Sequence, residues 1–73
     1  SEMRGHPFRG ATRAQMRARI DDAMLSDLDR RIANACFVEC CPSDVEAGVA
    51  AGCDRRTVKR HLPGIIEVLM IRE

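Results

Sequence analysis

Four cationic side chains stand close together near the carboxyl end of the chain, at Arg55, Arg56, Lys59 and Arg60. No acidic residue follows Asp54 within this segment. Arginine and lysine bind anions, and the planar guanidinium of arginine adds paired hydrogen bonds to a flat acceptor edge. Because many such clusters are only the solvated face of a helix, the elements around them decide their chemistry.

The thiol and imidazole side chains form no recognisable metal or catalytic motif. Cys36 and Cys40 are four residues apart and would share a helix face, whereas structural zinc sites pair two cysteine knuckles on loops. His61 has no serine, aspartate or cysteine partner at a spacing typical of nucleophilic catalysis. We therefore expect reduced thiols, no metal, no cofactor, no small-molecule ligand and no enzyme activity.

The first half of the chain has the hydrophobic spacing of helices. Apolar residues recur every three or four positions from Met16 to Met24, which predicts a helix over 12–24. Ser26 resembles an N-cap with an acid at the third helical position, and a second apolar stripe follows over 28–40. On one straight helix, the apolar row from Met16 to Cys40 would drift around the surface by about 40° per step of four residues, which favours two helices or a kink over a continuous rod.

A helix, a tight corner and a second helix are predicted over residues 43–62. Ser43, followed by an acid three residues later, resembles a capping box and starts a helix over 45–51. Gly52 then supplies the positive backbone angle that a tight corner needs. Two helices crossing at a wide angle touch at one point, and the small Gly48 suits that contact.

The second helix of this corner is expected to be short. Asp54 can cap it, and Val58 lies on its inner face. Pro63 with the glycine after it should end the helix, which gives a range of 55–62. The apolar segment 65–71 is either a short helix or a strand, because its β-branched residues leave the choice open.

The chain has 73 residues, the size of one small domain. We predict an all-α fold, a small bundle of four to five helices over 11–73, preceded by a flexible basic arm at 1–10. Charge is uneven, with +4 over 1–19, −6 over 20–54 and +3 over 55–73. The sequence has no long apolar run and no signal-peptide pattern, so we expect a cytoplasmic protein without a membrane partner.

The segment AGCDRRTVKRHL at 51–62 resembles the helix-turn-helix of bacterial and phage transcription regulators, which follows the pattern AGVSxxTVxRxL. The likeness covers about twenty residues, or about thirty-five if the helix at 28–40 supports the unit. It implies a tri-helical helix-turn-helix within the bundle. The chain departs from the pattern at Ala47, Gly48, Cys53 and Asp54.

The resemblance implies sequence-specific binding of double-stranded DNA by a small transcription regulator of phage, plasmid or bacterial origin. The second helix would lie in the major groove, with arginine on guanine and lysine on phosphate. The residues implied to bind DNA are Ser43, Arg55, Arg56, Thr57, Lys59 and Arg60, and the arm could add Arg4, Arg9 and Arg13.

We also expect a homodimer, because one such unit makes few DNA contacts and usually reads two half-sites. The favoured dimer surface is 65–71, where six of seven residues are apolar. The other candidate is the stripe of Met16, Ile20, Ala23 and Met24. The alternative function is a protein–protein interaction module that docks a partner on its acidic middle or its apolar carboxyl end.

Overall fold

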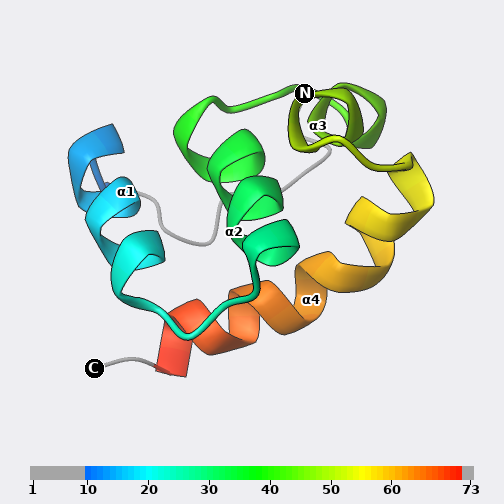
Figure 1. Cartoon of the computed structure of the whole chain (residues 1–73). Helices are drawn as coiled ribbons and strands as arrows, with labels where there is room; N and C mark the ends of the chain where they lie inside the picture. Colours follow the sequence, from blue (N-terminus) through cyan, green and yellow to red (C-terminus); the bar gives the residue numbers. More distant parts are fainter. Residues whose placement is uncertain (1–9, 72–73) are drawn as a thin grey trace.

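The computed structural model describes residues 10–71, which form helices and no strand. In chain order these are α1 (Arg13–Asp22), α2 (Asp27–Ala33), the π-helical segment η1 (Asn34–Val38), α3 (Asp44–Ala51) and α4 (Arg55–Ile71). Figure 1 shows α2 in the middle of the molecule, α1 and α3 on either side of it, and α4 along the lower edge. The predicted all-α fold is confirmed for this part of the chain.

The first two helices are separate, and each begins at a side-chain cap. The hydroxyl oxygens of Thr12 and Ser26 each accept a hydrogen bond of 3.1 Å from the backbone N–H three residues on. α1 ends at Asp22, two residues before the predicted end, because Ala23 is extended. α2 passes directly into the wider turns of η1, so the second apolar stripe spans two kinds of helix.

Two consecutive arginines of α2 bind backbone carbonyls of the neighbouring helices. Arg31 donates from Nε to the carbonyl oxygen of Ala51 at 2.9 Å, at the end of α3. The last carbonyls of a helix have no hydrogen-bond partner within that helix, and these guanidinium groups donate to them instead. Arg30 binds three carbonyls at the end of α1 and in the loop after it, those of Ile20 at 2.8 Å, Asp21 at 3.1 Å and Leu25 at 3.1 Å.

The predicted end of the last helix at Pro63 is wrong. α4 continues through Pro63 to Ile71, so the segment 65–71 is helical rather than a strand. An interior proline costs about 3 kcal/mol because it lacks an N–H. Burial of Ile65 and Leu69, both at most 1% exposed, contributes about 1.5–3 kcal/mol each and offsets that cost. Figure 1 shows α4 changing direction between its yellow and orange portions, as a proline kink does.

The core is built from α1, α2, η1, α3 and one face of α4. It contains three of the four residues of the predicted dimer surface on the first helix and two of the six on the carboxyl-terminal segment. Its largest fully buried side chains are Met16, Ile20, Ile32, Val58, Ile65 and Leu69. On α1 and the residues after it, only Met24 of the predicted stripe is exposed. Among the α4 side chains that the structure describes, the exposed large apolar ones are Val68 and Met70. Any dimer surface is therefore smaller than the sequence suggests.

Candidate nucleic-acid interface

α3 and α4 meet in a tight corner at Gly52. The Ser43 hydroxyl oxygen accepts from the backbone N–H of Glu46 at 3.2 Å and caps the start of α3. Gly52 ends α3 in the left-handed conformation, with φ of 80°. The next residue, Cys53, donates from its backbone N–H to the carbonyl of Gly48 at 2.8 Å. These features confirm the predicted start of the first helix and the predicted corner.

At Gly48, α3 lies in close contact with the backbone that leads into α4. A Cβ on this residue would lie 2.6 Å from the carbonyl oxygen of Cys53 and 3.3 Å from the backbone nitrogen of Arg55. Both neighbours are backbone atoms, so neither can rotate away. The predicted contact through a small residue is confirmed, and it holds the first turn of α4 against α3.

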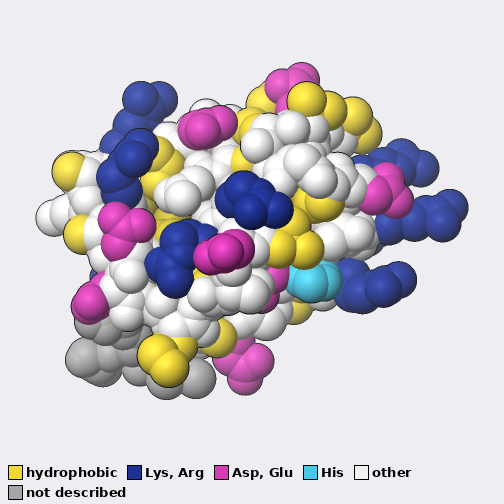
Figure 2. Space-filling view, viewed as in Figure 1, with side chains coloured by type: hydrophobic (Ala, Val, Ile, Leu, Met, Phe, Trp, Pro, Cys, Tyr) yellow, Lys and Arg dark blue, Asp and Glu magenta, His cyan; other side chains and the backbone are white. Residues whose placement is uncertain are grey.

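The first two turns of α4 present four cations to solvent: Arg55, Arg56, Lys59 and Arg60. None of their side chains has a hydrogen bond or ion pair with another residue of the described range. Figure 2 shows dark blue side chains gathered at the end of the molecule where α4 begins. Because these groups have no intramolecular partner there, their donors are available to an anionic ligand.

An open groove runs between the starts of α3 and α4. Its lining consists of Arg55, Arg56 and Lys59 from α4 with Asp44 and Val45 from α3. The sequence analysis missed the two residues from α3, although they directly follow the predicted cap. Asp44 places a carboxylate beside the three cations. Val45 is 53% exposed and adds an apolar surface that can contact a methyl group or a sugar.

The other predicted DNA-binding residues of this corner lie outside the groove lining. Arg60 is exposed, one residue beyond Lys59. Thr57 is half-buried, and its helical position places it on a different side of α4 from Arg55. Ser43 precedes the groove residues of α3, and its hydroxyl is already used as a cap.

Of the predicted arm contacts, the structure describes Arg13, and this residue does not join the site. Arg13 begins α1, which lies across the molecule from the start of α4 in Figure 1. The far end of α1 approaches the other end of α4, where Arg19 donates to the carbonyl oxygen of Leu69 at 3.5 Å. Arg4 and Arg9 lie outside the described residues.

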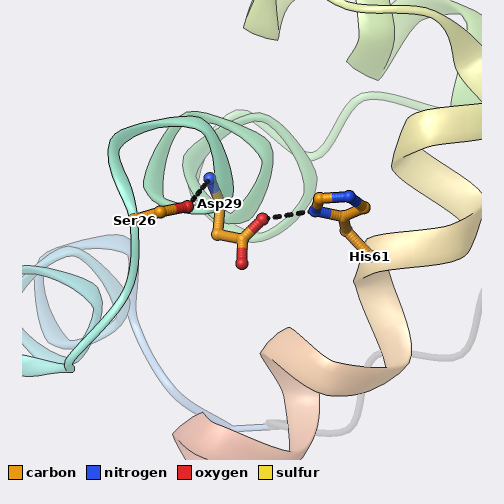
Figure 3. Close-up of polar contacts among 3 residues, drawn as sticks. All are labelled: Ser26, Asp29 and His61. Carbon is orange, nitrogen blue, oxygen red and sulfur yellow. Dashed lines mark hydrogen bonds and ion pairs between the residues drawn. The ribbon is translucent and has the colours of Figure 1, made fainter.

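An imidazole and a carboxylate pair at the edge of the basic end. His61 Nδ1 lies 2.7 Å from Asp29 Oδ1, which joins α4 to the first turn of α2. Figure 3 shows the backbone nitrogen of Asp29 held by Ser26 and its side chain turned toward His61. The two residues are 32 positions apart, so no local motif in the sequence reveals this pair.

The four cysteines are free thiols. Cys36 is buried, Cys41 and Cys53 are partly exposed, and Cys40 is exposed with a positive φ of 56°. Within residues 10–71, no group of three or more His, Cys, Asp or Glu side chains could hold a metal ion. None of the helices in that range is long and apolar enough to cross a membrane.

Comparison of the chain with protein-family models, with curated proteins and with solved structures finds no match. The corner between α3 and α4 is distinguished by its close backbone contact, its exposed cations and its open groove.

Proposed function

We propose that this protein binds double-stranded DNA through the first two turns of α4. The observation that carries the proposal is the set of four exposed cations, none of them paired within the described residues, on a helix start held in place by a tight corner. A single α-helix fits the major groove of B-DNA, which is about 12 Å wide. An exposed helix end rich in arginine matches both the shape and the charge of that groove.

The surrounding helices support a helix-turn-helix interpretation. α3 packs against α4, and α2 packs against both, so the corner rests on a third helix. The hydrogen bond from Arg31 of α2 to the carbonyl at the end of α3 holds α2 against α3. A helix that reads bases must be held rigidly, because misplacement weakens directional hydrogen bonds. We therefore assign α4 as the reading helix.

The groove residues divide into base contacts and backbone contacts. Arg55 and Arg56 lie at the start of the helix, where such helices usually reach base edges, and guanidinium binds guanine through two hydrogen bonds. Lys59, one turn later, is suited to phosphate. The carboxylate of Asp44 repels phosphate, while Val45 suits a thymine methyl.

We further propose that the protein is a non-enzymatic transcription regulator of phage, plasmid or bacterial origin that acts in the cytoplasm as a homodimer. A single corner with four cations gives few contacts, and specific binding generally requires more. Val68 and Met70 leave an apolar surface on the end of α4 away from the cations. A second copy that covers this surface would present two reading helices.

The test compares single alanine variants of Arg55 and Arg56 with Arg17→Ala, an exposed arginine of α1. A DNA site is first selected from random duplexes with the unaltered protein, and affinities are measured by fluorescence anisotropy at several salt concentrations. If the arginine reads a base, its alanine variant should lose about 1–3 kcal/mol of binding free energy. If the arginine binds phosphate, the slope of the logarithm of the binding constant against the logarithm of salt concentration should become shallower by about 0.9. Arg17→Ala should change neither quantity by as much.

Two outcomes contradict the proposal. One is that the selection with the unaltered protein enriches no duplex. The other is equal DNA binding by the α4 variants and the parent, with circular dichroism showing that all are folded. The alternative, a protein-docking module, predicts partner binding that depends little on salt, because an apolar interface releases few counterions.

A further inference from the structure

The imidazole of His61 is held at one nitrogen and open at the other. Asp29 Oδ1 lies 2.7 Å from Nδ1, and an ionised carboxylate only accepts hydrogen bonds, so Nδ1 carries a proton. Figure 3 shows the second ring nitrogen, Nε2, pointing away from Asp29, and the His61 side chain is 36% exposed. Nε2 is therefore an acceptor when the ring is neutral and a donor when it is protonated.

His61 lies at the end of the row of α4 cations: it directly follows Arg60 and is one turn beyond Thr57. Figure 2 shows a cyan histidine side chain next to dark blue atoms of Lys or Arg toward the end where α4 begins. The charged side chain that faces it from α2 is Asp29, and its charged neighbour on α4 is Arg60.

We propose that protonated His61 donates from Nε2 to a DNA phosphate, so that acidification strengthens DNA binding. This inference rests on the proposed function and adds a phosphate contact beyond the groove. Asp29 acts as a positioning residue: its carboxylate orients the ring and balances the charge of the imidazolium. Phosphate then meets a fixed N–H donor next to Arg60, and a charge-assisted hydrogen bond of this kind is among the strong ones in proteins.

The expected effect is a gain in affinity as the pH falls. Histidine is the side chain whose ordinary charge change lies between about pH 5 and 8. A hydrogen bond to a charged group is worth roughly a tenfold change in affinity. The unaltered protein should therefore bind a labelled duplex of mixed sequence about tenfold more tightly near pH 6 than near pH 8. The salt slope should also be steeper at the lower pH, by about 0.9 for one added phosphate.

The experiment measures this pH dependence for His61→Gln and Asp29→Asn, with His6→Gln as the matched control because His6 is the other histidine of the chain. His61→Gln should lose the gain near pH 6, and Asp29→Asn should reduce it, because asparagine accepts from Nδ1 but carries no charge. His6→Gln should behave as the parent. Circular dichroism at both pH values reports whether each variant is folded. Nitrogen NMR of labelled histidine should show the Nε2 resonance of His61 move when the duplex binds.

The outcomes separate this inference from the proposed function. The phosphate contact is overturned, and DNA binding is left intact, if the parent and His61→Gln bind DNA with the same pH dependence. The same holds if the parent binds DNA but the Nε2 resonance of His61 does not move. A parent that binds no duplex at either pH overturns both. Should His61→Gln fail to fold, the NMR measurement on the parent alone decides the matter.

Discussion

Gly48 carries a steric requirement that can be measured directly. Alanine at this position gains about 1 kcal/mol of helix propensity over glycine. Its Cβ would lie 2.6 Å from the carbonyl oxygen of Cys53, and overpacking against fixed atoms costs about 1–3 kcal/mol or more. We expect the clash to dominate, so Gly48→Ala should lower the free energy of unfolding in urea titrations, by up to about 2 kcal/mol.

Gly64 provides the matched control. It lies inside α4, and a Cβ there would meet nothing within 4 Å. Gly64→Ala should therefore raise the free energy of unfolding by about 0.5–1 kcal/mol through helix propensity alone. A Gly48→Ala variant at least as stable as the parent would show that α3 and the corner can move apart.

At the scale of single residues, the sequence predicts the roles of residues that interact with backbone a few positions away. Ser43, Gly48 and Gly52 were all predicted in their observed roles, because caps, corners and close contacts follow from residues a few positions apart. The pair of His61 with Asp29 and the carbonyl contacts of Arg30 join distant parts of the chain. Such contacts depend on how helices pack, which one sequence does not determine by local rules.

At the scale of elements, α4 is where local propensity and packing disagree. Pro63 predicts a helix end, yet Ile65 and Leu69 continue the buried stripe that starts at Val58. Their spacing of seven and eleven residues from Val58 keeps all three on one helix face. The prediction failed because it treated proline as a stop signal and did not extend that stripe across it.

Replacing the proline is expected to stabilise the protein. Pro63→Ala restores a backbone N–H in the middle of α4 and should raise the free energy of unfolding by about 1–3 kcal/mol. Thermal unfolding followed by circular dichroism measures the change. A lower melting temperature would mean instead that the bend at Pro63 is needed to seat Ile65 and Leu69.

At the scale of the whole molecule, the proposed homodimer depends on a small apolar surface on the last turns of α4. Val68 is 36% exposed and Met70 is 59% exposed, while Leu69 between them is fully buried. Val68→Asp with Met70→Asp should therefore convert a dimer to a folded monomer in sedimentation at micromolar concentration. Leu69→Asp is unsuitable as a test, because a buried carboxylate would unfold the chain.

Met24→Asp distinguishes the two candidate dimer surfaces. Met24 is 91% exposed and follows α1, so its substitution should leave a dimer through α4 unchanged. Loss of the dimer in Met24→Asp alone would move the interface to the end of α1. A parent protein that sediments only as a monomer would contradict the proposed dimer altogether.

The bend in α4 also bears on the geometry of the DNA that a dimer would select. α4 has 17 residues and is about 25 Å long, with the cations on its first turns and Val68 and Met70 on its last. In a dimer joined at the last turns, the bend at Pro63 sets how far apart the two reading ends lie. Half-sites on one face of DNA recur about every 34 Å, so a change in that separation changes which spacing both copies can occupy. Pro63→Ala should thus shift the preferred distance between half-sites in a random-duplex selection, while each half-site keeps its sequence.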